Sequence, residues 1–263
     1  MSPFTRSHRG GEGPPLVCLH GFTDTWRTWE LVLPMLEREY EVLAPTLPGH
    51  AGGPPITGPV SETVLGDGVE RAMDEAGFET AAIAGNSLGG YLALELATRG
   101  RADSVVALAP AGGWVDDSYK ETLAHFATMQ ELLKAAAPHA DEIVSTDGGR
   151  RQATQFVTER YEHIPPELLA HQLRGAALCP AAAALIEHGL NAGWPLDAER
   201  ITCPVRVVWG TEDKLLLWPS AAERYRRHAL QQADWVVLDG VGHCPQLDVP
   251  LEAAQLIAGF IAR

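Results

Sequence analysis

Residues 85–89 read G-N-S-L-G, which places a serine between two glycines in the pattern G-x-S-x-G. An apolar run precedes this pattern and a helix-forming run follows it, so the stretch predicts a strand, a sharp turn and a buried helix. A turn this tight presses the residues two before and two after the serine against neighbouring backbone, so both must be small. It also holds the serine in a strained conformation with its hydroxyl exposed. We therefore predict that Ser87 is a nucleophile.

A serine hydroxyl needs a base to react at neutral pH, and the base needs an acid that orients it. Among ten histidines, His243 lies in a loop directly after the predicted strand 234–239. Ligands and catalytic groups gather at the carboxyl edge of parallel strands, and Ser87 lies at that edge too. We predict His243 as the base. The region 116–190 holds five further histidines, which we expect to be solvated or packed: His125, His139, His163, His171 and His188.

Asp213 is the predicted acid. It follows the predicted strand 204–210, and it gives the order serine, acid, histidine that accompanies this serine motif. Other carboxyls also follow strands or flank the histidine loop, and the sequence leaves them open as alternatives: Asp116, Asp117, Glu212, Asp239 and Asp248.

An acyl-transfer site must also stabilise the oxyanion of a tetrahedral intermediate with backbone N–H groups. The amide of Leu88 directly follows the serine at a helix N-terminus, where the helix dipole adds positive potential. The amide of Phe22 lies in the loop after the first predicted strand, beside Gly21, whose missing side chain lets the backbone approach a substrate. We predict these two amides as the oxyanion hole.

Apolar runs alternate with helical patterns along most of the chain. Buried strands are predicted at 15–19, 40–45, 80–86, 104–110, 204–210 and 234–239, and helices at 25–39, 60–76, 88–98 and 250–262. This alternation predicts a doubly wound, mostly parallel sheet with helices on both faces. Between about 116 and 190 only helical patterns occur, broken by proline and glycine. The expected organisation is a core of residues 1–114 and 196–263 with a helical cap of residues 115–195.

With these features in place, the chain resembles the α/β-hydrolase family with a helical cap. The resemblance rests on H-G-F at 20–22, P-G-H at 48–50, G-N-S-L-G-G at 85–90, G-T-E-D at 210–213 and G-H at 242–243. It implies an α/β-hydrolase fold of about seven or eight strands, with the cap inserted after the sixth family strand. It also implies Ser87 as nucleophile, His243 as base, Asp213 as acid, and the Phe22 and Leu88 amides as oxyanion hole.

The chain departs from the family's pattern in three places. Thr46 stands where the family usually has aspartate, and Ala51 replaces a common glycine after His50. The N-terminal β-hairpin is cut short, so that seven rather than eight strands could form. Serine at the turn argues against the haloalkane dehalogenase and epoxide hydrolase branches, which have aspartate there.

The predicted function is hydrolysis of a neutral, fairly hydrophobic carboxylic ester through an acyl-enzyme. Four tryptophans near loops or cap hinges could line an apolar pocket: Trp26, Trp114, Trp194 and Trp218. No lysine or arginine in a predicted loop forms a compelling clamp for a substrate carboxylate. Carbon–carbon bond hydrolysis, lactone hydrolysis and perhydrolysis use the same triad and stay open, as does a ligand-sensing protein on the hydrolase fold.

Composition narrows the partners of the chain. Its 263 residues carry a formal net charge of −14, which disfavours nucleic acid and anionic membrane surfaces. There is no apolar run of about 18 residues and no apolar N-terminal segment, and the four cysteines form no C-x-x-C pair. We expect a cytoplasmic protein with a small-molecule substrate and neither metal nor cofactor, either monomeric or homodimeric.

Overall fold

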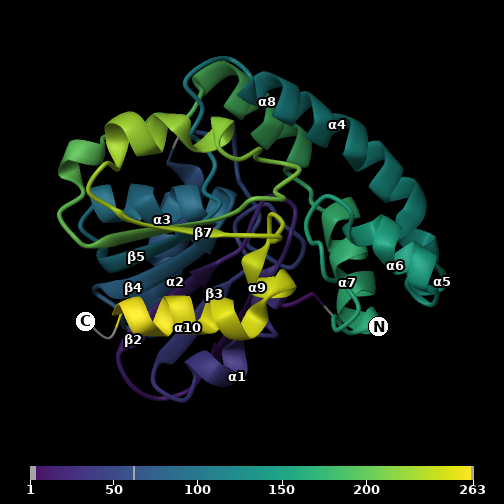
Figure 1. Cartoon of the computed structure of the whole chain (residues 1–263), viewed down its shortest axis with the longest axis horizontal. Helices are drawn as coiled ribbons and strands as arrows, with labels where there is room; N and C mark the ends of the chain where they lie inside the picture. Colours follow the sequence, from purple (N-terminus) through teal and green to yellow (C-terminus); the bar gives the residue numbers. More distant parts are fainter. Residues whose placement is uncertain (1–3, 62, 262–263) are drawn as a thin grey trace.

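The computed structural model describes residues 4–61 and 63–261, and these form a seven-stranded sheet with helices on both faces (Figure 1). The strands are β1 (Ser7–Gly10), β2 (Pro15–Leu19), β3 (Glu41–Pro45), β4 (Ala81–Asn86), β5 (Ala102–Leu108), β6 (Val205–Gly210) and β7 (Asp234–Leu238). Their order in the sheet is β1-β3-β2-β4-β5-β6-β7. All neighbours are parallel except β1 and β3, which are antiparallel. This architecture confirms the predicted fold class.

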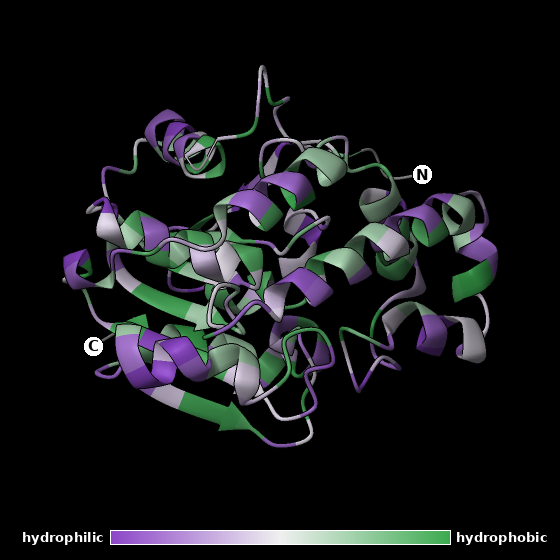
Figure 2. Ribbon diagram, turned by 90° about the horizontal axis from the view of Figure 1, so that it is seen from above, coloured by the Kyte–Doolittle hydropathy of each residue, from purple (hydrophilic) through white to green (hydrophobic). Residues whose placement is uncertain are grey.

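Successive residues of the central strands enter two different cores. In β2, Val17 and Leu19 pack with α2 (Val64–Ala76) and α3 (Leu88–Thr98). Leu16 and Cys18 pack with α1 (Leu33–Leu36) and α10 (Pro250–Ile261) on the other face. Figure 2 accordingly shows hydrophobic residues along the strands and mixed residues along the helices. Burial on both faces explains why these strands are continuous apolar runs in the sequence.

The structure differs from the sequence prediction at two places in the core. β1 was not predicted, because this edge strand alternates exposed and half-buried residues. The helix predicted at 25–39 is two short pieces, η1 (Trp26–Trp29) and α1; Pro34 has no N–H to continue a helix through this point. The predicted end of the last helix, Ala262, lies outside the described residues. Between β6 and β7 the chain forms two short helices, the 3-10 helix η4 (Ser220–Ala222) and the π-helix η5 (Tyr225–Ala229).

Helices fill the segment between β5 and β6, and its described residues contain no strand. They are α4 (Tyr119–Ala136), η2 (Ala137–His139), α5 (Ala140–Val144), α6 (Asp147–Thr154), α7 (Pro166–Ala177), α8 (Ala182–Ala192) and η3 (Ala198–Arg200). Figure 1 shows α4 to α7 arching beside the sheet. Whether residues 115–195 form a separate domain stays a prediction. Across the described chain no single helix is long and apolar enough to span a membrane. Helices α7 and α8 have that length and apolarity only when taken together, and they are bent by 67° relative to each other.

The turn between β4 and α3 is packed backbone against backbone. A Cβ atom on Gly85 would lie 2.1 Å from the carbonyl oxygen of Gly89. A Cβ atom on Gly89 would lie 2.2 Å from the carbonyl oxygen of Leu19 and 2.6 Å from that of His20. These contacts confirm the predicted need for small residues on either side of Ser87, and they press the start of α3 against the end of β2.

We expect Gly89→Ala to lower the free energy of unfolding by about 1–3 kcal/mol or more, because the added methyl group meets backbone that cannot rotate away. Urea unfolding of the two variants measures this. Gly259→Ala in α10 is the control: its Cβ would meet nothing within 4 Å, so alanine should be neutral or stabilise by up to about 1 kcal/mol. Equal stability of the two variants would show that the turn is not tightly packed.

Candidate active site

Ser87 lies between the end of β4 and the first turn of α3, with φ 57° and ψ −116°. A non-glycine residue rarely adopts positive φ, so the surrounding structure must hold this conformation. The Ser87 N–H donates to Leu108 O at 2.9 Å, while the Ser87 carbonyl accepts from the Tyr91 and Ala111 N–H groups at 3.0 Å each. Ser87 therefore has the strained backbone conformation that was predicted, and hydrogen bonds to its N–H and to its carbonyl hold it in place.

His243 and Asp213 are hydrogen-bonded: His243 Nδ1 lies 2.7 Å from Asp213 Oδ2, and both side chains are almost completely buried. The other Asp213 oxygen accepts from the Leu215 and Leu216 N–H groups at 2.9 and 2.8 Å, which fixes the carboxylate. His243 lines the same cavity as Ser87. Among the described side chains of Ser87, His243 and Asp213, the structure shows the hydrogen bond between His243 and Asp213. In a structure without substrate, the distance between a catalytic serine and its base is often longer than a hydrogen bond.

Asn86, the residue before Ser87, connects the serine turn to the histidine loop. Its Nδ2 donates to the backbone carbonyl of His243 at 3.0 Å and to that of Leu108 at 3.2 Å. Its Oδ1 accepts from Gln246 Nε2 at 3.1 Å and from Cys244 Sγ at 3.3 Å. This role was not predicted, because nothing local to a variable position of G-x-S-x-G indicates a partner more than 150 residues away.

Asp248 holds the histidine loop from the other side. Its carboxylate accepts from the Gly242 N–H at 2.6 Å and the Arg160 N–H at 2.6 Å, and from the Glu159 N–H at 3.1 Å. Asp248 therefore joins this loop to the segment after α6, and it is not the acid on His243. The remaining alternatives also bind elsewhere: Asp116 accepts from Ser118, Asp117 from Lys120, and Glu212 and Asp239 from Thr211.

We expect Asp248→Asn to lower the free energy of unfolding by about 1–3 kcal/mol, because the amide nitrogen cannot accept the backbone N–H groups that the carboxylate now satisfies. Urea unfolding measures the change. Asp239→Asn removes an exposed carboxylate from the same part of the chain and should change stability by less than about 0.5 kcal/mol. If both variants match the wild type, Asp248 does not stabilise the loop.

The loop at Gly21 and Phe22 lies beside Ser87. A Cβ atom on Gly21 would lie 3.3 Å from Ser87 Cβ, so glycine lets this backbone pass close to the serine. His20 Nε2 accepts from the Leu47 N–H at 2.8 Å, so Nδ1 carries the proton that is shared with Gly21 O at 2.7 Å. Burial lowers the pKa of His20 well below its usual value, which keeps the ring neutral. His20 thus positions the loop that carries the predicted Phe22 amide. The other predicted amide, that of Leu88, is at the first residue of α3, where N–H groups have no hydrogen-bond partner within the helix.

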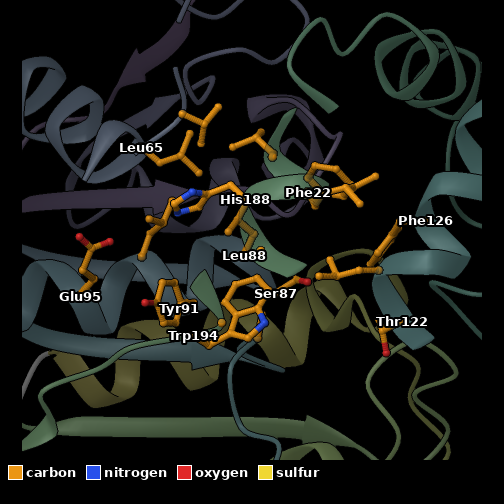
Figure 3. A pocket seen from close by; sticks show the side chains of 18 of the residues that line it. Phe22, Leu65, Ser87, Leu88, Tyr91, Glu95, Thr122, Phe126, His188 and Trp194 are labelled. Atoms are coloured by element: carbon orange, nitrogen blue, oxygen red, sulfur yellow. The ribbon is translucent and has the colours of Figure 1, made fainter. Parts of the chain in front are cut away.

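Two chambers meet at Ser87. The α3 chamber, of about 100 Å³, is lined by Ser87, Leu88, Tyr91, Leu92 and Glu95 of the α3 segment and by residues of α4, α8 and neighbouring loops (Figure 3). The α7 chamber, of about 490 Å³, is lined by His243, Asp24 and residues of α4 to α7. Phe22, Ser87 and Phe126 line both. The Phe22 and Phe126 rings meet edge to face at 5.3 Å, so they stand where the chambers join.

The described residues that line the two chambers include no lysine or arginine. Of the four predicted pocket tryptophans, Trp114 and Trp194 line the α3 chamber. Trp26 instead stacks on His8, and Trp218 packs near Trp209 and Trp235. Within residues 4–61 and 63–261, no group of three or more His, Cys, Asp or Glu side chains is placed to hold a metal ion.

Asp24 is a carboxyl group in the wall of the α7 chamber. Its Oδ1 accepts from the Thr25 N–H at 2.7 Å, and its Oδ2 accepts from Gln172 Nε2 of α7 at 3.3 Å. Burial raises the pKa of Asp24 to about 6, although the hydrogen bonds from these donors lower the pKa in part. Asp24 was not predicted as a site residue, since nothing in the local sequence shows that a lone aspartate in a loop is buried.

The raised pKa of Asp24 makes stability depend on pH. Between about pH 4 and 6 the folded protein binds this proton more tightly than the unfolded chain, so the contribution to stability falls as pH rises through that window. Above it the cost is roughly 3 kcal/mol at most. Asp24→Asn should therefore lose less stability than the wild type between pH 4.5 and 7.5 in urea unfolding. The exposed Asp103→Asn serves as control, and parallel profiles for the wild type and Asp24→Asn would contradict the assignment.

Comparison with known proteins agrees with this architecture. A model of the alpha/beta hydrolase family matches residues 16–256. The chain is 36% identical over 205 residues to epoxide hydrolase EphH of Mycobacterium tuberculosis, covering 77% of this chain and 95% of that protein. It is 28% identical over 271 residues to a pimeloyl-acyl-carrier-protein methyl ester esterase of Aromatoleum aromaticum, covering 94% and 98%. The solved enol-lactonase from Burkholderia xenovorans LB400 has the same fold, with a TM-score of 0.73 and 18% identity over 98% of this chain and 96% of that one.

Proposed function

Since this chain belongs to the alpha/beta hydrolase family, we propose that it is a serine hydrolase that cleaves carboxylic esters. Ser87 is the nucleophile, His243 the base, and Asp213 the acid that orients His243. The observation that carries this proposal is the hydrogen bond of 2.7 Å between His243 and Asp213, beside a strained serine that lines the same cavity.

The proposed reaction has two steps. His243 Nε2 takes the proton of the Ser87 hydroxyl as the oxygen attacks the ester carbonyl, and the Phe22 and Leu88 amides bind the oxyanion that forms. His243 then gives this proton to the departing alcohol, leaving an acyl group on Ser87. Water attacks the acyl group by the same route, and the free acid leaves. Asp213 accepts the His243 Nδ1–H throughout, which keeps Nε2 directed at the reaction.

The two chambers indicate how an ester lies in the site. His243 must reach the oxygen of the departing alcohol, and His243 lines the α7 chamber. We therefore assign the alcohol part to the α7 chamber, of about 490 Å³, and the acyl part to the α3 chamber, of about 100 Å³. A slender acyl chain and a bulkier alcohol fit these volumes. The absence of lysine and arginine from the described lining favours a neutral ester.

A series of p-nitrophenyl esters from acetate to decanoate tests the reaction. We expect the wild type to prefer one chain length, which measures the α3 chamber, and Ser87→Ala to lose at least about a thousandfold in kcat/KM. Ser145→Ala, at an exposed serine in another part of the chain, is the matched control and should retain full activity. Turnover by Ser87→Ala at the wild-type rate, or no turnover of any ester by the wild type, would overturn the proposal.

Epoxide hydrolysis is a second candidate, favoured by the 36% identity to an epoxide hydrolase. Serine that opened an epoxide would form an ether, which water attacks poorly, whereas a carboxylate would form an ester that can be hydrolysed. Asp24 places a carboxyl group in the same chamber as His243. If styrene oxide is a substrate, Asp24→Asn should abolish its hydrolysis while Ser87→Ala leaves it intact. The reverse pattern on p-nitrophenyl esters is the result that the esterase proposal requires.

A further inference from the structure

The rings of Phe22 and Phe126 form an aromatic partition between the α3 and α7 chambers. The two rings meet edge to face, with their centroids 5.3 Å apart and their planes at 80°. Each residue lines both chambers. In Figure 3 these two residues lie on one side of Ser87, whereas Tyr91 and Glu95 lie on the other. An acyl chain that enters the α3 chamber from Ser87 therefore runs away from the partition.

The core holds one half of the partition in place. The Phe22 ring also meets the ring of His50 edge to face, at 6.1 Å and 89°. His50 is buried and in turn contacts the ring of His20 at 5.0 Å. Phe22 is thus packed between a buried histidine of the core and Phe126 of the helical segment. Because its amide is also predicted to bind the oxyanion, Phe22 is a poor position for a test substitution.

The other half of the partition, Phe126, belongs to α4. Its neighbour His125 also lines the α7 chamber, and the His125 ring packs edge to face against Phe156 at 5.0 Å. Consecutive residues of α4 therefore contact the loop after β2 on one side and the segment after α6 on the other. These contacts fix α4 across the site, while Phe126 carries none of the groups proposed for the chemistry. Its ring can be shortened without changing those groups.

The chambers on the two sides of the partition differ in size. The α3 chamber has a volume of about 100 Å³ and the α7 chamber about 490 Å³. An apolar cavity of about 150 Å³ holds one benzene molecule. A phenyl ring is therefore too large for the α3 chamber, whereas the α7 chamber has room for it. The partition keeps these two spaces apart next to Ser87, so a bulky group fits on one side of the ester only.

We propose that Phe126 determines the direction in which an ester binds, and thereby which half of the substrate is bulky. This assignment rests on the proposed esterase function and names its substrate class: esters of a short unbranched acid with a bulky apolar alcohol. The isomeric ester, with a bulky acid and a short alcohol, is excluded because its acyl group does not fit the α3 chamber. Without the Phe126 ring the two chambers join, and a bulky acyl group gains space beside Ser87.

A pair of isomeric esters tests the assignment. 2-Phenylethyl butanoate and propyl 3-phenylpropanoate contain the same atoms and two alkyl alcohols, and they differ in the direction of the ester group. We expect the wild type to prefer 2-phenylethyl butanoate by at least about tenfold in kcat/KM, measured by titration of the released acid. Phe126→Ala should bring the ratio close to one by gaining activity on propyl 3-phenylpropanoate. Phe126→Leu, which keeps much of the side-chain volume, should give an intermediate ratio and tests the proposal if the alanine variant does not fold.

Leu132→Ala is the matched control. Leu132 lies on the same helix and lines the α7 chamber, but it does not belong to the described wall of the α3 chamber. This variant should keep the wild-type ratio within about twofold. A wild-type ratio near one, a wild-type preference for propyl 3-phenylpropanoate, an unchanged ratio in both Phe126 variants, or loss of the preference in Leu132→Ala would overturn the proposal.

A crystal structure of Ser87→Ala with 2-phenylethyl butanoate separates this inference from the proposed reaction, since this variant lacks the nucleophile. A phenyl ring in the α7 chamber and a propyl chain in the α3 chamber support the assignment even if the wild type hydrolyses no ester. A phenyl ring in the α3 chamber refutes it even if the wild type is an active esterase. Absence of the ester from a crystal soaked at its solubility limit also refutes it, because neither half then fits its chamber.

Discussion

The close approach of backbone where β2, β4 and α3 meet is the constraint on which the site depends. Gly85 and Gly89 lie against carbonyl oxygens, and no side chain fits at either position. The start of α3 is thereby held beside the end of β2. This packing brings the Ser87 hydroxyl, the first amides of α3 and the Gly21 loop into one small volume. Backbone packing thus fixes the position of the Ser87 hydroxyl, which is a form of preorganisation.

Buried polar side chains extend this order to the C-terminal half of the chain. Asn86 binds the backbone carbonyl of His243 from the side of the serine, and Asp248 binds the neighbouring Gly242 N–H from the other. Asp213 bonds to the His243 ring itself. In a buried environment each of these bonds is strong, and each is costly to lose. Together they hold the histidine loop by its backbone and its ring, so the orientation of His243 depends on the folded core.

The helices between β5 and β6 contribute differently from the core. They provide much of the wall of both chambers, and Phe126 of α4 meets Phe22 of the serine-side loop where the chambers join. A small shift of α4 would therefore alter the two chambers at once. The core carries the groups proposed for the chemistry, while this helical segment shapes the space for the substrate. Such a division lets selectivity change while the reacting groups stay in place.

The sequence by itself determined the parallel sheet, because buried strands need continuous apolar runs, and it placed Ser87, Asp213 and His243 after strands at one sheet edge. Only the tertiary structure decided what depends on contacts between distant segments. The polar edge strand β1, the hydrogen bonds of Asn86 and the place of Asp24 in the wall of the α7 chamber have no local signal. The spacing of apolar residues along the sequence indicates which side chains are buried. The hydrogen-bond partner of a buried polar group, in contrast, depends on how elements far apart in the chain pack together.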